Sequence, residues 1–117
     1  MASDRIRRVD EAIRQVIGET VSKDLKDPRV GFVTVTDVRT SNDLSHARVY
    51  VSVLGEDEQR EQSMDGLRSA HGYLQARLAG ELRMKRTPTL EFAYDQTTDR
   101  AMRLEQLMGQ TEAPSDE

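Results

Sequence analysis

The stretch HARVYVSVL, residues 46–54, contains the clearest strand pattern of the chain, because polar and apolar side chains alternate from residue 46 to residue 53. Alanine or valine occupies every second position from Ala47 to Val53, and the positions between them carry His46, Arg48, Tyr50 and Ser52. Successive side chains of a strand point to opposite faces of a sheet. The pattern therefore predicts a β-strand with one face in the core and the other face open.

Upstream of this strand, the sequence predicts a helix, a further strand and a tight turn. Residues 4–23 place apolar side chains at the three-and-four spacing of one buried stripe, with Ser3 or Asp4 as the N-cap. Residues 30–39 are rich in Val, Thr and Phe and predict a strand. Residues 41–43 read Ser-Asn-Asp and supply turn chemistry, so the two strands should form a β-hairpin.

Downstream, helical spacing returns over residues 57–84 and is followed by a third strand. Gly72 lies inside the helical stretch, where glycine costs about 1 kcal/mol relative to alanine, so we expect a kink between two helices there. A simply tolerated glycine is the alternative. Apolar residues alternate again around Phe92 and predict a strand. Residues 97–108 predict a last short helix, whose inward side chains are Ala101, Leu104 and Met108.

The predicted order is helix, strand, strand, helix, helix, strand, in a chain whose 117 residues correspond to one domain. The helical connection between the second and third strands is long enough for a right-handed parallel crossover. We therefore expect an α+β two-layer domain over residues 1–108, with helices on one face of a three-stranded sheet. The polar, acidic residues 109–117 predict a disordered tail.

Composition and motifs exclude several function classes. The chain has no cysteine, which excludes disulfides and thiolate zinc sites. Charged residues interrupt every apolar run in residues 1–20, so we expect no signal peptide, no membrane span, and a soluble, cytoplasmic protein. Neither histidine stands near a carboxylate pair at ligand spacing, and the sequence has no phosphate-loop or nucleophile motif. We expect no catalytic residue, no metal and no cofactor.

The net charge of −4 argues against a nucleic-acid partner, but the charges are unevenly distributed. Residues 55–65 hold five acids against one arginine, and residues 89–117 hold seven acids against two arginines. Residues 66–88, in contrast, hold five cations against a single glutamate. The sequence therefore predicts a molecule with a basic side and an acidic side, whose basic side can be steered toward phosphate.

Three ordered segments resemble the ribosome-binding factor A family. Residues 26–32 (KDPRVGF) with residues 43–51 (DLSHARVYV) look like the first half of that family, and residues 82–95 (LRMKRTPTLEFAYD) are similar to its closing signature. Between them, Ala70-His71-Gly72 matches the Ala-x-Gly kink that the family carries in place of the usual KH loop. The resemblance covers roughly residues 5–108 in the family's order and spacing.

The resemblance implies a type II KH-like fold and a non-catalytic ribosome biogenesis factor. Such a factor binds free or immature 30S subunits, contacts 16S rRNA, and assists late 30S maturation and 16S rRNA processing, including growth in the cold. The implied partners are the 30S subunit and its 16S rRNA, with ribosomal proteins and other assembly factors as further candidates. We expect a monomer that has no membrane partner.

One departure from ordinary KH domains changes the expected mode of RNA recognition. Residues 69–72 read Ser-Ala-His-Gly and lack the Gly-x-x-Gly loop that clamps a nucleotide backbone. Capture of single-stranded bases in the ordinary KH manner is therefore disfavoured. We expect recognition of a folded RNA surface through its phosphates, with an affinity that depends strongly on salt.

Cations at four places are the candidate RNA contacts. Three precede Pro88, where a helix ends; cations there also favour the helix dipole by up to about 1 kcal/mol, but three exceed what a helix end requires. Three more open the first helix, where the dipole disfavours positive charge. Two flank Asp27-Pro28, where local pairing with Asp24 or Asp27 is an open alternative, and one follows the kink. The full set is Arg5, Arg7, Arg8, Lys26, Arg29, Arg77, Arg83, Lys85 and Arg86.

Other conspicuous residues receive structural interpretations. Ala70, His71 and Gly72 should form the kink, where the two small side chains let the helices meet closely. Arg48 should join a cross-strand pair on the open face of the sheet. Four aromatic residues should pack in the core rather than stack on bases: Phe32, Tyr73, Phe92 and Tyr94.

Three rival functions stay open at this point. The first is a protein-interaction domain that docks a partner through its sheet edge or its acidic helix. The second is a small hydrolase that uses Asp27, His46 or His71. The third is a generic binder of single-stranded RNA, against which the missing Gly-x-x-Gly loop counts.

Overall fold

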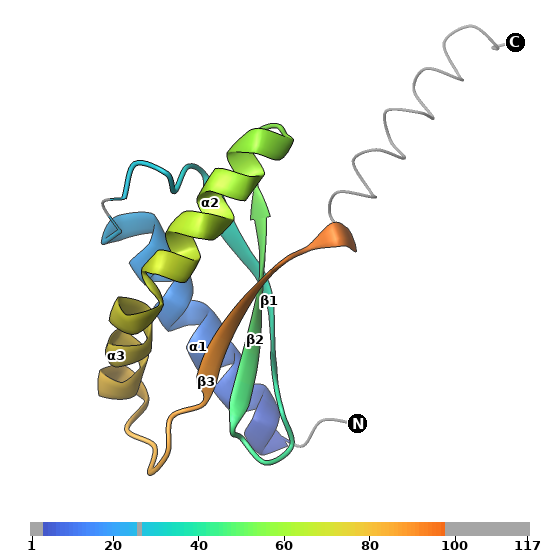
Figure 1. Cartoon of the computed structure of the whole chain (residues 1–117). Coiled ribbons are helices and arrows are strands. Elements are labelled where there is room, and N and C mark those ends of the chain that lie inside the picture. Colours follow the sequence, from blue (N-terminus) through green and yellow to red (C-terminus); the bar gives the residue numbers. More distant parts are fainter. Residues whose placement is uncertain (1–3, 26, 98–117) are drawn as a thin grey trace, which may run out of the picture.

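The computed structural model of the chain describes residues 4–25 and 27–97 (Figure 1). Its elements follow the predicted order of helix, strand, strand, helix, helix, strand. They are α1 (Asp4–Lys23), β1 (Val33–Thr40), β2 (His46–Val53), α2 (Asp57–Ser69), α3 (His71–Leu82) and β3 (Thr89–Tyr94). Lys26, the predicted tail over residues 109–117 and the predicted helix beyond residue 97 lie outside the described residues.

The three strands form one mixed sheet in the order β1-β2-β3. β1 and β2 are antiparallel, with Val33 opposite Val53, as the predicted hairpin requires. β2 and β3 are parallel, with Val51 opposite Tyr94. A parallel pair needs a long crossover, and α2 and α3 together supply it. The alternating stretch at residues 46–54 therefore becomes the central strand of the sheet.

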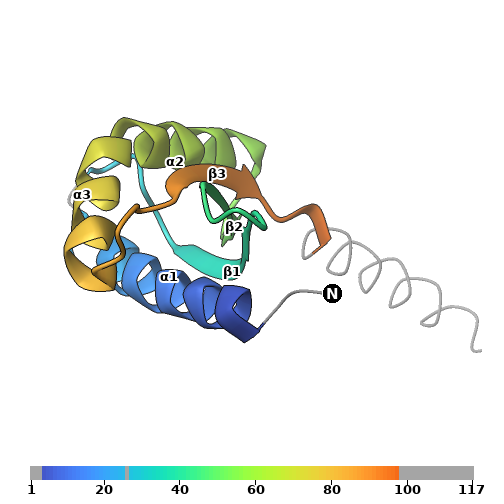
Figure 2. The ribbon, with the colours of Figure 1, turned by 90° about the horizontal axis from the view of Figure 1, so that it is seen from below.

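Figure 2 shows that the helices surround one face of the sheet. α1 lies beside β1, α2 lies beside β3, and α3 lies between α1 and α2. Along β2, the side chains that alternate toward the helices are buried, whereas Arg48 on the opposite face is exposed. No described element covers that opposite face. The predicted α+β two-layer architecture is therefore confirmed.

The core lies between the helices and the sheet and is built from aliphatic side chains. Ile13 and Ile17 of α1 are fully buried, in agreement with the predicted stripe. Burial of one such side chain contributes about 1.5–3 kcal/mol to the free energy of unfolding. The other fully buried aliphatic residues of large size are Val49, Val51, Leu67, Leu74 and Leu78.

β1 begins three residues later than predicted, because α2 holds the residues that precede it. The Ser63 hydroxyl accepts a hydrogen bond from the Gly31 N–H at 3.3 Å and donates one to the Arg29 carbonyl at 3.3 Å. Gly66 permits this close approach, since an added Cβ would lie 2.6 Å from Cγ2 of Val30. Residues 29–31 therefore pack on α2 instead of extending the strand.

Two of the four aromatic residues assigned to the core lie on the surface. The exposed fractions of Phe32 and Tyr73 are 79% and 49%. Phe32 alternates with the core-facing Val33, and Tyr73 precedes the buried Leu74 on α3, so both side chains point outward. Phe92 is buried as predicted.

The break between α2 and α3 falls at Ala70 rather than at Gly72. Ala70 has φ −88° and ψ 8°, and it is partly buried against the core. A Cβ on Gly72 would meet no heavy atom within 4 Å. The prediction that Gly72 must be small for the helices to approach closely is therefore wrong, whereas the prediction of two helices is confirmed.

Candidate nucleic-acid interface

Three segments that are distant in the sequence meet at one end of the sheet: the start of α1, the β1–β2 turn and the α3–β3 loop (Figures 1 and 2). The Asp10 carboxylate of α1 accepts hydrogen bonds from the N–H and the hydroxyl of Thr40. The Thr89 N–H donates to the Ser45 carbonyl at 2.9 Å. These bonds connect the β1–β2 turn to the start of α1 and to the α3–β3 loop. The six cations of the α1 start and the α3–β3 loop therefore lie at the same end of the molecule.

We call this region the basic end and define it by Arg5, Arg7, Arg8, Arg83, Lys85 and Arg86. All six side chains are exposed. In the part of the chain that the structure describes, none of the six has an ion partner. An exposed cation without a partner can bind a phosphate without first breaking an internal ion pair. The basic end is thus the described surface best suited to anionic ligands.

The base of the α3–β3 loop is fixed by two side chains of α3. The Gln75 amide donates to the Pro88 carbonyl at 2.8 Å and accepts from the Leu90 N–H at 2.9 Å. His71 Nε2 donates to the Leu90 carbonyl at 2.8 Å. Both residues therefore hold the outer edge of β3, at the point where the loop joins the strand. His71, which the sequence placed only in the kink, therefore also attaches α3 to the backbone of β3.

The loop leaves α3 through Arg83, whose backbone is left-handed with φ 53° and ψ 35°. A left-handed residue commonly ends a helix by turning the chain away from the helix axis. Arg83 thereby starts the loop that carries Lys85 and Arg86 and ends at the fixed strand start. A loop held at its strand end loses less conformational entropy when a ligand binds than a free loop does.

The β1–β2 turn is held around one carboxylate. Asp43 accepts hydrogen bonds from the hydroxyls of Ser45 and Ser41, each at 2.7 Å, and from the Ser45 N–H at 3.1 Å. Led by the Ser45 hydroxyl, these bonds lower the pKa of Asp43 from 3.8 to about 2. Asp43 therefore remains charged at neutral pH, and its charge stabilises the turn rather than a cation of the basic end.

Three other predicted or conspicuous cations already have carboxylate partners. Arg29 Nη2 lies 2.6 Å from Asp27, and the hydrogen bonds from Arg29 lower the pKa of Asp27 to about 2. Local pairing is thus the observed alternative for Arg29. Arg77 pairs with Asp24 of the α1–β1 loop at 3.3 Å, which leaves it less available than the basic end. The predicted cross-strand pair of Arg48 is formed with Glu91 at 3.2 Å.

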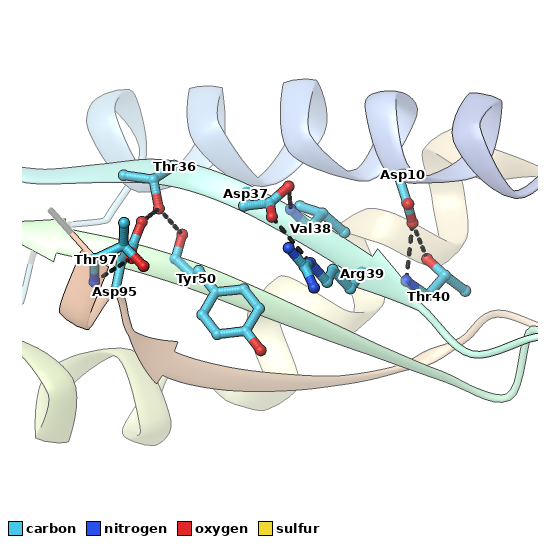
Figure 3. Close-up of polar contacts among 9 residues, drawn as sticks. All are labelled: Asp10, Thr36, Asp37, Val38, Arg39, Thr40, Tyr50, Asp95 and Thr97. Carbon is cyan, nitrogen blue, oxygen red and sulfur yellow. Dashed lines mark hydrogen bonds and ion pairs between the residues drawn. The ribbon is translucent and has the colours of Figure 1, made fainter. Parts of the chain in front are cut away.

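A second polar network joins all three strands on the open face of the sheet (Figure 3). Thr36 is an extra residue in β1, at a register shift between Val35 and Asp37. Its hydroxyl donates to Asp95 Oδ2 at 2.6 Å, and the Asp95 N–H donates to the Val51 carbonyl at 2.7 Å. This network fixes the end of β3 against β1. This network was not predictable from the sequence, because it depends on the bulge.

Charge of the opposite sign gathers at the other end of β2. The eight residues of β2 span about 25 Å at the usual strand rise, and α2 starts just beyond the far end. Glu56 opens α2 with a capping box, and three further exposed acids follow: Asp57, Glu58 and Glu61. The predicted separation of a basic and an acidic side is thus present as two ends of the sheet.

The family model of ribosome-binding factor A matches residues 5–108. The chain belongs to the ribosome-binding factor A family. This family consists of ribosome-binding factors and not of enzymes, and the hydrolase alternative is therefore withdrawn. The contacts agree, since Asp27 is paired with Arg29 and His71 with the backbone of β3.

Solved structures of ribosome-binding factor A have the same fold as this chain. The crystal structure of the Thermus thermophilus protein is 34% identical, covers 76% of this chain and 93% of its own, and gives a TM-score of 0.69. A solution structure from Thermotoga maritima, described as a candidate ribosome binding factor A, is 32% identical over 80% of this chain and 89% of its own, with a TM-score of 0.70. A Thermus thermophilus homology model fitted into a cryo-EM map of a 30S complex is 34% identical over 74% of this chain and 91% of its own, with a TM-score of 0.62.

Two other kinds of site are absent from the described residues. No group of three or more His, Asp or Glu side chains there is placed to hold a metal ion. None of the described helices is both long and apolar enough to cross a membrane.

Proposed function

We propose that this ribosome-binding factor A protein binds free or immature 30S subunits by placing its basic end against 16S rRNA. The observation that carries the proposal is the gathering of six exposed, unpaired cations from the start of α1 and the α3–β3 loop. A relative from Thermus thermophilus has been fitted as a homology model into the map of a 30S complex, which supports the choice of subunit.

The proposed recognition uses phosphates and RNA shape rather than unpaired bases. Ordinary KH domains clamp four nucleotides with a Gly-x-x-Gly loop, whereas Ala70 here is a single-residue break between two helices. The edge of β3 next to this break is hydrogen-bonded at Pro88 and Leu90 by Gln75 and His71. A base would have to displace these side chains to reach the same backbone groups. Structured RNA is therefore the favoured ligand.

The mechanism is a shift in the population of rRNA conformations. A binding protein that contacts one rRNA conformation better than another favours that conformation by the difference in binding free energy. The factor would in this way hold an immature region until late 30S maturation and 16S rRNA processing are complete. The same effect would support growth in the cold, where alternative RNA structures resolve slowly.

The remaining parts of the proposal concern the state of the protein. Residues 1–108 act as one domain, and the protein works as a cytoplasmic monomer without a cofactor. Among the nine predicted RNA contacts, Arg29 and Arg77 are secondary because carboxylates engage them. Lys26 stays a candidate on sequence alone.

Co-sedimentation with purified small subunits, large subunits and full ribosomes across a salt series tests the proposal. We expect binding to free small subunits alone, with an affinity that falls as salt rises. The triple variant Arg83→Ala, Lys85→Ala, Arg86→Ala should bind at least roughly tenfold more weakly, with a salt slope smaller by about three, one unit for each phosphate contact removed.

A matched control removes three cations that lie outside the basic end: Arg14→Ala, Lys23→Ala, Arg68→Ala. All three are exposed, and Arg14 and Arg68 pair with acids one helical turn away. This control changes the net charge equally and should leave binding nearly unaffected. Equal losses in both triple variants would show that net charge alone matters, and no binding of the wild type at low salt would contradict the proposed function.

A further inference from the structure

We call the end of the sheet next to Glu56, Asp57, Glu58 and Glu61 the acidic end. Two exposed apolar residues, Phe32 and Leu54, lie there. The exposed fractions of Phe32 and Leu54 are 79% and 69%, the highest of any large hydrophobic residues that the structure describes. The two are direct neighbours, since the Leu54 N–H donates to the Phe32 carbonyl at 3.0 Å. Single surface hydrophobics are ordinary, but adjacent ones of this size are typical of interaction sites.

The backbone presents this pair rigidly. Gly55 has φ +134° and turns the chain into α2, and an added Cβ there would collide with Gln59 Oε1. That same oxygen accepts a hydrogen bond from the Glu56 N–H at 2.7 Å. Leu54 is therefore fixed between the end of β2 and the capped start of α2. A backbone that is already held loses less conformational entropy on binding, which favours Leu54 as an anchor.

The surroundings of the pair carry negative charge. Residues 54–62 contain four acids and one arginine. That arginine, Arg60, lies 3.0 Å from Asp57 and 4.5 Å above the Tyr94 ring, so it is already engaged. Glu58 and Glu61 are exposed and have no ion partner among the described residues. RNA phosphates are repelled by this field, and a cationic protein segment is attracted to it.

We propose that Phe32, Leu54 and the acidic start of α2 form a docking surface for a protein segment that is rich in lysine or arginine and carries a large apolar side chain. The apolar side chain would pack on Phe32 and Leu54, and the cations would face Glu58 and Glu61. The proposal rests on the proposed function, because the segment is sought in a protein of the small subunit. The factor would then hold rRNA at its basic end and a basic protein at the other end of the sheet.

Photo-crosslinking from position 32 tests this assignment. The full-length protein with Phe32→p-benzoylphenylalanine is bound to small subunits, irradiated, and the crosslinked partner is identified by mass spectrometry. The matched control carries the same group as Tyr73→p-benzoylphenylalanine, since Tyr73 is an exposed aromatic residue on α3. We expect a crosslink to a lysine- or arginine-rich segment of a small-subunit protein from position 32 and not from position 73.

The alternative occupants are separate outcomes of the same experiment. A crosslink from position 32 to rRNA, to a second copy, or to residues 98–117 of the same chain would overturn the proposal, as would bound protein without any crosslink. In each of these cases the factor still co-sediments with small subunits, so the proposed function stands. Loss of co-sedimentation by the wild type itself overturns both.

An affinity measurement provides a second test with a distinct signature. The double variant Phe32→Ser, Leu54→Ser should bind small subunits roughly tenfold more weakly, the loss expected for removing an apolar anchor. Its salt slope should equal that of the wild type, because no phosphate contact is removed. Both substitutions are on the surface, and an unchanged circular dichroism spectrum would verify the fold. Unchanged affinity of the folded variant, or an altered salt slope, would contradict the proposal.

Discussion

The two ends of the sheet use charged residues in opposite ways. At the basic end, Asp10 and Asp43 are engaged by hydrogen bonds, Asp10 with Thr40 and Asp43 with its neighbouring serines, and the six cations have no ion partner among the described residues. At the acidic end, the cations Arg29 and Arg60 are engaged by Asp27, Asp57 and the Tyr94 ring, and exposed acids remain. The net charge of −4 hides this difference, because the charges left available are positive at one end and negative at the other.

Reversing the sign of the charges at the basic end should give the largest change in binding affinity. The triple reversal Arg83→Glu, Lys85→Glu, Arg86→Glu should weaken binding to small subunits by at least about 100-fold at moderate salt, because each favourable phosphate contact becomes a repulsion. The reversal Glu58→Lys, Glu61→Lys at the other end should not weaken rRNA binding. Filter binding of the first variant to small subunits, and of both variants to 16S rRNA free of ribosomal proteins, checks this. A comparable loss of 16S rRNA binding from the second reversal would remove the distinction between the ends.

The next largest effect concerns the support of the basic loop. Gln75→Ala leaves the Pro88 carbonyl and the Leu90 N–H without their side-chain partner, and should lower the free energy of unfolding by about 1–3 kcal/mol. Urea denaturation measures the loss. A control, Gln62→Ala, truncates an exposed glutamine of α2 and should change stability by no more than about 0.5 kcal/mol. Equal stability of the two variants would show that Gln75 does not fix the loop.

Substitutions of Asp10 separate two effects of this carboxylate: its hydrogen bonds to Thr40, which stabilise the fold, and its negative charge, which opposes anion binding. Asp10→Ala removes the acceptor of two hydrogen bonds from Thr40 and should cost about 1–2 kcal/mol of stability. Asp10→Asn retains a carbonyl acceptor and loses only the charge, so it should be nearly as stable as the wild type. Both variants should bind small subunits slightly more tightly, because one negative charge is gone from beside the cations. Thermal melts and co-sedimentation together check this, and weaker binding by the stable Asn variant would contradict it.

The smallest effect is a pH dependence shared by the two ends. The pKa values of Asp27 and Asp43 are lowered from 3.8 to about 2 in the folded protein. A lowered pKa means that the unfolded state binds protons more readily, so stability is complete above about pH 4 and falls as the pH drops from there through about 2. Unfolding followed between pH 5 and 2 should show this loss. The loss of stability between pH 5 and 2 should be smaller in Asp43→Asn and in Asp27→Asn than in the wild type. If both variants lost as much stability as the wild type, the assignment to these two carboxylates would be contradicted.

Much of the fold was predictable because it depends on local periodicity. The alternation through residues 46–54 predicted the central strand, and the apolar stripe of residues 4–23 predicted α1 to the residue. The length of residues 57–84 implied a parallel crossover. The start of β1 was misplaced, since its limit is set by Ser63 and Gly66 of a distant helix. The surface position of Phe32 follows from its alternation with the core-facing Val33.

The candidate site was predictable only in outline. Clusters of cations are visible in the sequence, as is the resemblance to a family of ribosome-binding factors. The roles of Gln75 and His71 were missed, although their spacing of four residues on one helix face could have suggested a joint function. The exposed pair of Phe32 and Leu54 was likewise hidden, because Phe32 resembles a core residue in sequence.

The element types, the sheet pairing by hairpin and crossover, and the family were all predictable from the sequence alone. Those properties follow from periods of 2 and 3.6 residues and from short motifs, all of which are local. Only the tertiary structure decided which charges are free. Asp24 meets Arg77, Asp10 meets Thr40 and Ser45 meets Thr89 across long stretches of chain. Such pairings depend on distances between folded elements, and a linear pattern of charges does not encode them.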